Sequence, residues 1–265
     1  MSMSTRVAMV MVLVAISAGF SLEAQDARVR QVLDRGRLAL AGGTERTLPN
    51  TFAMTGRRTV SGDGGKTYSF EIYAQLPDKF VWKEDSARRG VTARRGFDGN
   101  RLITDVPQDL ALSIPMSEGA TPAQRADVPR DADQLKTVRA QFSALTLGLF
   151  ATSLRSVPLT FADVQGGETA NAIGVSGRDG FGATLAFDRA TGLPAWLGYR
   201  EPSQQGSVSR RWVYGHYRNV EGRMVPHELT WMMSYSETGP LLKSAEYTVT
   251  EYRFDLPIDP KVFKR

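Results

Sequence analysis

The sequence predicts an α+β fold whose main part is a large, mainly antiparallel sheet. The expected elements run in the order helix, about five strands, a long loop and helix, then six or seven strands; runs of strands interrupted by helices are typical of this class. Two expected strands, Val208–Tyr217 and Arg223–Tyr235, have ten or more residues. Strands usually have about five or six, so we expect a curved sheet or barrel wall with helices on one side.

A tight hairpin is predicted between these two long strands. Glu221-Gly222 suits a two-residue loop, because glycine accepts the positive φ that such loops require. This loop fixes the pairing, and paired side chains share a face. The pairs on one strongly apolar face are Arg210 with Met233, Trp212 with Trp231, Tyr214 with Leu229, and His216 with His227. Tyr217 and Glu228 are expected on the opposite face.

The other elements follow from periodicity and turn residues. Apolar residues at helical spacing predict an N-terminal helix over 26–41, ended by Gly42-Gly43. The apolar alternation of the last strand shifts between Val249 and Tyr252, which indicates a bulge or burial on both faces. Strands are predicted between Gly, Asp and Pro turns. They are Thr51–Val60, Lys66–Gln75, Phe80–Glu84, Gly90–Gly96, Arg101–Val106, Leu159–Val164, Ala170–Gly177, Phe181–Phe187, Leu193–Tyr199 and Lys243–Phe254.

A long helix is expected over 131–155, capped by Asp131 or Asp133 and packed on the sheet. The segment before it, 107–130, lacks periodicity and is rich in Pro, Ser, Ala and Asp. Such a composition indicates either a mobile flap or a surface excursion. The apolar stripe of the helix recurs every three or four residues, at Leu135, Val138, Phe142, Leu145 and Leu149.

The first residues are typical of a secretory signal peptide. An uncharged apolar stretch over 7–20 follows Arg6, a small residue precedes Gln25, and the stretch is short for a membrane span. We expect cleavage after residue 24 and one domain over 25–265, with retention as an anchor as the alternative. The chain has no cysteine, which excludes a disulfide framework and a lipid-modified cysteine. The expected location is the periplasm, with secretion as the alternative.

Motifs for nucleic-acid binding, catalysis or a cofactor are not found. The net charge is +5, but acidic residues are interspersed with the basic ones and no aromatic-plus-basic motif occurs. His216 and His227 are the only imidazoles. Zinc needs three or four ligands, so we expect structural histidines and no metal.

Neither the nucleophile motif G-x-S-x-G nor a phosphate-binding loop occurs in the sequence. We expect no cofactor and no enzymatic activity; a hydrolase with a dispersed carboxylate pair is an alternative.

Several short segments match one known superfamily in their order along the chain. They are the signal peptide, the helix end Leu40–Gly43, Leu76–Phe80, Phe97–Gly99, Phe187–Pro194, Tyr217–Pro226 and Ile258–Phe263. Together they resemble the periplasmic outer-membrane lipoprotein-sorting proteins, the LolA/LolB-like superfamily. The lipid-anchored receptors of that superfamily need a cysteine, so this cysteine-free chain looks more like the soluble carrier branch.

The resemblance implies a half-open, mainly antiparallel β-barrel, covered on its concave side by helices, with an apolar cavity. The implied function is a soluble periplasmic carrier or sensor that reversibly binds the acyl chains of lipids or lipoproteins, with transient contact to a membrane surface. The alternative is a non-catalytic envelope scaffold with a filled barrel that binds other envelope proteins. The candidate lining residues, each of which could instead be ordinary core, are Tyr68, Phe70, Ile72, Phe80, Trp82, Trp212, Tyr214, Leu229, Trp231 and Met233.

Overall fold

The architecture is that of a computed structural model, which describes most of the chain from residue 27 onward. The described ranges are 27–61, 64–86, 91–105, 131–152, 159–164, 168–177, 180–203, 206–234 and 239–264. The expected signal peptide over 1–24 and the expected flap over 107–130 lie outside them.

A single twelve-stranded sheet forms the body of the molecule, in the order β5-β4-β3-β2-β1-β12-β11-β10-β9-β8-β7-β6. Every neighbouring pair is antiparallel, so the predicted α+β class with an antiparallel sheet is confirmed. The described residues also form a helix over 27–40, α4 (Asp131–Phe150) and the 3-10 helix η1 (Pro260–Phe263). The strands are β1 (Thr51–Val60), β2 (Thr67–Gln75), β3 (Lys79–Ser86), β4 (Val91–Asp98), β5 (Arg101–Thr104), β6 (Leu159–Val164), β7 (Ala170–Gly177), β8 (Gly182–Asp188), β9 (Pro194–Ser203), β10 (Gly206–Val220), β11 (Arg223–Met233) and β12 (Leu242–Phe254).

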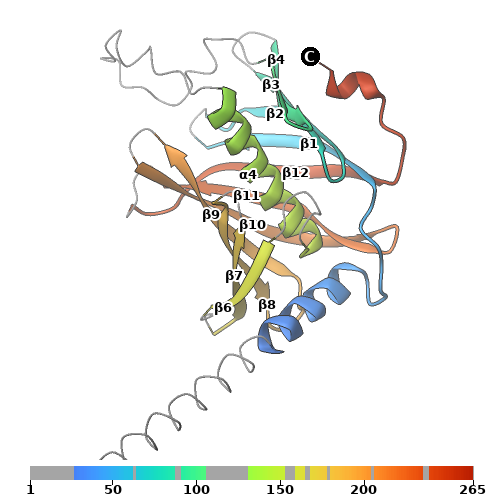
Figure 1. Cartoon of the computed structure of the whole chain (residues 1–265), viewed down its shortest axis with the longest axis vertical. Helices are drawn as coiled ribbons and strands as arrows, with labels where there is room; N and C mark the ends of the chain where they lie inside the picture. Colours follow the sequence, from blue (N-terminus) through green and yellow to red (C-terminus); the bar gives the residue numbers. More distant parts are fainter. Residues whose placement is uncertain are drawn as a thin grey trace, which may run out of the picture.

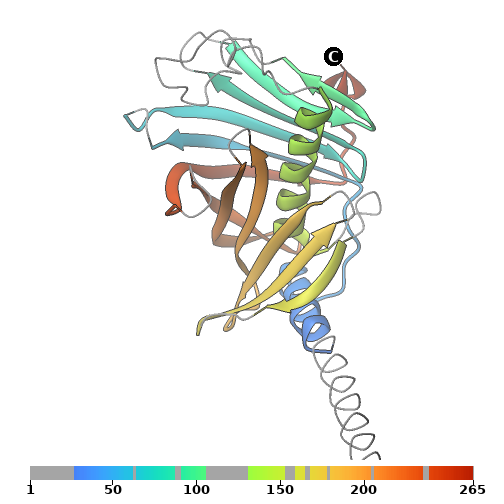
Figure 2. The ribbon, with the colours of Figure 1, turned by 60° about the vertical axis from the view of Figure 1, so that its left-hand side comes forward.

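The sheet is strongly curled, which brings strands from both of its ends to α4. This helix contacts β4 and β5 near one end of the strand order and β8 and β9 near the other end. Strands so far apart in a flat sheet could not touch one helix, so the sheet must bend to bring its ends together. Figure 1 shows α4 crossing in front of the strands, and Figure 2 shows the two groups of strands on either side of it. The edges β5 and β6 are not paired with each other, which leaves the sheet open.

The long hairpin has the predicted register. Trp212 pairs with Trp231, Tyr214 with Leu229, and Arg210 with Met233, around the turn Glu221-Gly222. Both turn residues have positive φ, 52° and 80°. This two-residue loop with positive φ at both positions is the hairpin geometry that matches the twist of the strands.

The prediction that His216 lies on the apolar face was wrong. His216 has a φ of 51°, and its side chain is exposed, with Nε2 3.2 Å from Oε2 of Glu228. His227 is instead buried, and its Nδ1 donates to the carbonyl oxygen of Val249 at 2.8 Å. Alternation along β10 is interrupted at this position, so Tyr217, expected outside, packs against the core. The two imidazoles therefore occupy different environments.

The parity shift in the last strand is a β-bulge. Thr55 pairs with Glu251 and Gly56 with Val249, which leaves Thr250 as the additional residue on β12. The Thr250 hydroxyl donates to the carbonyl oxygen of Thr55 at 3.1 Å. An extra residue changes which side chains face inward, so Val249 and Tyr252 are both buried, as the sequence predicted.

The N-terminal helix lies at one end of the curled sheet, against the β8–β9 turn. Nη2 of Arg35 donates to the carbonyl oxygens of Arg189 and Ala190 at 2.8 and 3.1 Å. Nε of Arg37 donates to the carbonyl oxygen of Ala151 at 3.0 Å, just after α4. Ala151 has a φ of 48°, so α4 ends at Phe150, earlier than the predicted limit of 155.

Gly148 allows α4 to approach β10 closely, which leads to a testable expectation. A Cβ at this position would overlap the hydroxyl of Tyr214, a buried group with no hydrogen-bond partner among the described residues. Alanine is the better helix former by about 1 kcal/mol, yet overpacking typically costs about 1–3 kcal/mol. We therefore expect Gly148→Ala to lower the free energy of unfolding, measured by urea denaturation. In a Tyr214→Leu background the same substitution should be neutral or stabilising; an equal loss in both backgrounds would contradict the contact.

Candidate functional site

The candidate lining residues lie on the inner face of the curled sheet. Seven of them are buried in one core cluster, namely Phe70, Ile72, Phe80, Trp82, Trp212, Tyr214 and Leu229. Trp231 is partly buried and packs against that cluster. Tyr68 and Met233 are half-buried, each near the end of its strand. The residues predicted from alternation therefore share a wall; their binding role stays a prediction.

Aromatic rings join strands that are distant in the sheet. The centroids of Trp82 on β3 and Trp212 on β10 are 6.1 Å apart, and the rings are stacked. Trp212 lies 4.3 Å from Trp231 and 5.3 Å from Tyr247 of β12. Four strands separate β3 from β10 in the sheet order, so the Trp82–Trp212 contact spans its concave face. We call Trp82, Trp212, Trp231 and Tyr247 the inner aromatic layer.

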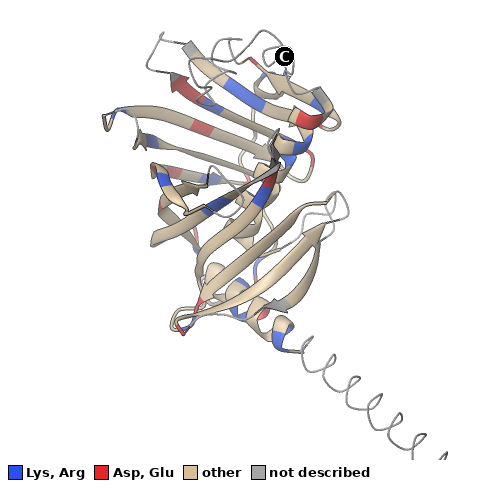
Figure 3. Ribbon diagram, turned by 90° about the vertical axis from the view of Figure 1, so that its left-hand side faces the viewer, with Lys and Arg blue, Asp and Glu red and all other residues tan. Residues whose placement is uncertain are grey.

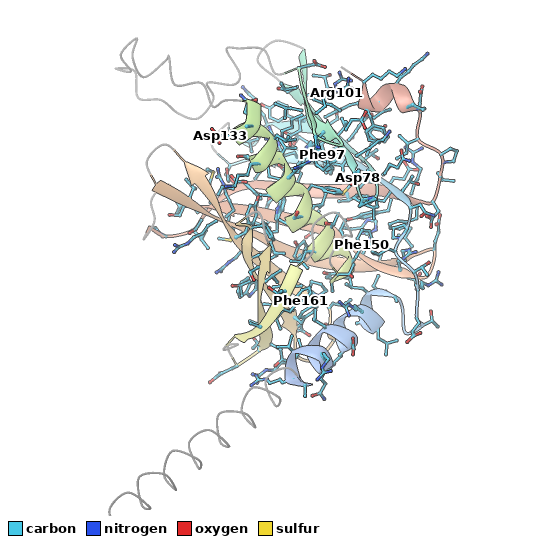
Figure 4. The ribbon with its side chains drawn as sticks, in the orientation of Figure 1. Asp78, Phe97, Arg101, Asp133, Phe150 and Phe161 are labelled. Carbon is cyan, nitrogen blue, oxygen red and sulfur yellow. The ribbon has the colours of Figure 1, made fainter. Side chains whose placement is uncertain are left out.

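The helix α4 packs on aromatic rings next to this layer, where Phe80 lies 6.5 Å from Trp82 between ring centroids. Phe142 lies 4.9 Å from Phe80 and 5.3 Å from Phe97, measured between ring centroids. Figure 4 shows Phe97 beside one half of α4 and Phe150 at its C-terminal end. Sequence reasoning missed Phe97 and Tyr247 as inner-face residues. Phe97 lies just beyond the predicted strand Gly90–Gly96, and the parity shift of the last strand obscures the face of Tyr247.

Charged side chains form a belt along one end of the inner aromatic layer, and the first part of it is an ion pair. Nη1 of Arg58 on β1 lies 2.7 Å from Oε2 of Glu84 on β3. The Tyr247 hydroxyl donates to the other oxygen of Glu84 at 3.3 Å. Burial, followed by the Glu84 charge, raises the pKa of Tyr247. Tyr247 thus links the aromatic layer to the belt and stays protonated at neutral pH.

The second part of the belt surrounds Glu201, a carboxylate only 4% exposed. Nε of Arg210 lies 3.0 Å from its Oε2. The Tyr199 hydroxyl and Nε2 of Gln141 donate to its Oε1 at 3.1 and 3.3 Å. Three elements, β9, β10 and α4, meet at this carboxylate. Burial and the Glu201 charge together raise the pKa of Tyr199 well above its usual value.

The third part of the belt is Arg95 on β4, which has a different kind of neighbour. Its guanidinium lies over the Trp82 ring, 5.1 Å from the centroid. Its charge acts on both Tyr199 and Tyr247, lowering the pKa values that burial raises. Among the described residues no carboxylate forms an ion pair with Arg95. Figure 3 shows acidic and basic residues interspersed on the strands.

A small hollow of about 120 Å³ lies near the C-terminal end of α4. Leu40, Leu149, Phe150 and Val225 contribute apolar atoms, and three arginines, Arg37, Arg46 and Arg223, contribute polar ones. Ligand pockets typically have about 300–1,000 Å³. The hollow is therefore too small to hold a long acyl chain.

Two features are absent from the part of the chain that the structure describes, a cluster of metal ligands and a helix suited to span a membrane. There, no three His, Asp or Glu side chains lie close enough to hold a metal ion. No helix there has both the length and the apolar character needed to cross a membrane.

Comparison with known proteins identifies the fold. No protein-family model and no curated protein sequence matches the chain. A crystal structure of a LolA superfamily protein from Nitrosomonas europaea does match, with a TM-score of 0.52 at 11% identity, over 89% of this chain and 97% of that chain. The chain has the fold of the LolA superfamily.

Two other structures match this LolA-like chain with lower TM-scores. Each match covers 89% of this chain and 97% of the other chain. A domain assigned to outer membrane lipoprotein sorting, from Vibrio parahaemolyticus, has a TM-score of 0.45 at 10% identity. A DUF1329 family protein from Desulfovibrio piger has a TM-score of 0.42 at 8% identity. The fold assignment rests on the first structure.

Proposed function

We propose that this LolA-like chain is a periplasmic carrier or sensor that reversibly binds the acyl chains of lipids or lipoproteins. In this proposal α4 covers the concave side of the sheet, and the acyl chain lies between α4 and the inner aromatic layer. The observation that carries it is the apolar wall on the inner face of the sheet, against which α4 packs, with the charged belt at one end of the inner aromatic layer. Such a wall supports binding without covalent chemistry, because burial of apolar surface contributes about 25 cal/mol per Å².

A long acyl chain can enter only if groups on the concave side move. The rings of the inner aromatic layer contact one another, and Phe142 of α4 contacts Phe80. Polar contacts in this part of α4 include Nη2 of Arg139, which donates to Asn100 Oδ1 at 2.7 Å and to the Gly99 carbonyl oxygen at 3.0 Å, and Gln141, which donates to Glu201. A helix that packs on the sheet through an apolar stripe can separate from it when a ligand replaces those apolar contacts.

The proposed location follows from the expected signal peptide over 1–24 and the absence of cysteine. Lipid or lipoprotein acyl chains are the proposed ligands, and transient contact with a membrane surface would allow their transfer.

The test is ligand capture by the processed chain. Native mass spectrometry after mild purification should show a co-purifying amphiphile, and the delipidated protein should take up a fluorescent fatty acid. Neither a bound amphiphile nor uptake would overturn the carrier proposal.

A second candidate function is an envelope scaffold with a filled barrel, which the direct ring-to-ring packing of the inner aromatic layer favours. A reducible crosslink separates the two functions, because the chain has no cysteine of its own. Cysteines at Asn100 and Arg139, joined by a reducible bifunctional reagent that spans the reach of the arginine side chain, would tie α4 to the β4–β5 turn. The carrier predicts that this crosslink abolishes fatty-acid uptake and that reduction restores it, whereas a Thr59–Thr67 crosslink within the sheet has no effect. The scaffold predicts no uptake in any form.

A further inference from the structure

The charged belt at the end of the inner aromatic layer is not electrically balanced. It contains three arginines, Arg58, Arg95 and Arg210, and two glutamates, Glu84 and Glu201. Each glutamate is within ion-pair distance of one arginine, 2.7 Å for Glu84 and 3.0 Å for Glu201. Arg95 is left as the additional positive charge.

Arg95 also lies where the two walls of the curled sheet face each other. It projects from β4, stacks on Trp82 of β3, and acts electrostatically on hydroxyls from β9 and β12. An apolar chain that ran along the inner aromatic layer would therefore end beside its guanidinium. Guanidinium groups present several N–H donors in a fixed plane that matches carboxylate and phosphate oxygens.

A second unpaired donor lies beneath Arg95. The side chain of Trp82 is 3% exposed, and its indole Nε1 is buried with no hydrogen-bond acceptor among the described residues. An unsatisfied buried donor costs free energy until an acceptor reaches it. A positive charge and an unsatisfied N–H side by side favour a ligand group that is anionic and rich in acceptor oxygens.

We propose that Arg95, with Trp82, binds the anionic head group of a single-chain amphiphile, a carboxylate or a phosphate, whose apolar tail lies along the inner aromatic layer. This inference rests on the proposed carrier function and specifies its ligand class. Arg58 and Arg210 do not serve the same purpose, because each already neutralises a glutamate.

The experiment compares ligands that differ only in the head group. Dodecanoate, dodecyl phosphate and dodecanol are titrated against the delipidated chain, with binding followed by calorimetry. A hydrogen-bonded charge pair should make the two anions bind about 10–100-fold more tightly than the alcohol. Arg95→Gln should remove that preference without changing the affinity for dodecanol, and Arg95→Lys should keep part of it.

Arg94→Gln is the matched control, because Arg94 is the preceding residue, faces the other side of β4 and pairs with Asp105 at 2.5 Å. It should keep the full preference for the anions.

Acetate and inorganic phosphate test whether the site binds free anions instead of the head group of an amphiphile. If either ion displaced dodecanoate at equal concentration, the site would be one for free anions, and the head-group proposal would be overturned. Equal binding of all three amphiphiles, or an unchanged preference in Arg95→Gln, would overturn the head-group site while leaving the carrier intact. Binding of none would overturn the carrier itself.

Discussion

Trp212→Ala should lower the free energy of unfolding by about 3–5 kcal/mol, as large-to-small changes of fully buried aromatic residues do. Trp212 is 3% exposed and contacts three other rings, those of Trp82, Trp231 and Tyr247. Its loss would leave a cavity in the middle of the inner aromatic layer. Urea denaturation followed by far-ultraviolet circular dichroism measures the effect without relying on tryptophan fluorescence.

Two other tryptophans provide graded controls for this expectation. Trp231 is only partly buried, so Trp231→Ala should cost less than Trp212→Ala. Trp196 lies on the opposite face, where the guanidinium of Arg211 stacks over it at 4.5 Å, and Trp196→Ala should cost least. An equal loss for Trp212 and Trp196 would show that the inner aromatic layer does not hold the two walls together.

Arg210→Met should also be strongly destabilising, by about 3–5 kcal/mol, because it leaves the buried Glu201 carboxylate without its cation. Tyr199 and Gln141 would still donate hydrogen bonds to Glu201, but both are neutral. The measurement is again the free energy of unfolding at neutral pH.

The double variant Arg210→Met/Glu201→Leu tests the cause. Replacing a whole buried ion pair by apolar residues is often neutral or stabilising, so the double variant should regain most of the loss. A double variant as unstable as Arg210→Met would mean that Arg210 acts through packing of its aliphatic part and its contact with the Trp231 ring at 5.7 Å rather than through charge.

Local features of the fold could be predicted because each depends on neighbouring residues. The register of the long hairpin follows from Glu221-Gly222, and the bulge at Thr250 follows from the shifted alternation around it. His216 could not be predicted in the same way. Its positive φ is unusual for a residue other than glycine, and nothing in the strand pattern indicates it.

For the candidate site, the sequence could predict only which side chains share a face of the sheet. Alternation placed Trp82 and Trp212 each on an apolar face, but their contact depends on how far the sheet curls over four intervening strands. The charged belt depends on the same curvature, since Arg58 and Glu84 lie on strands separated by β2, and Glu201 meets Gln141 from α4. Single-strand patterns carry no information about these distances, which is why Arg95 was not among the sequence-based candidates.

The most direct test of an acyl chain inside the curled sheet uses the position of the tryptophans. Three of the four, Trp82, Trp212 and Trp231, lie on the inner face, and Trp196 lies on the other. Bromine atoms quench indole fluorescence only on close contact, so a fatty acid brominated in mid-chain reports where the tail lies. We expect saturable quenching that is fully retained in Trp196→Phe. Absence of quenching, or quenching that disappears in Trp196→Phe, would contradict binding at the inner aromatic layer.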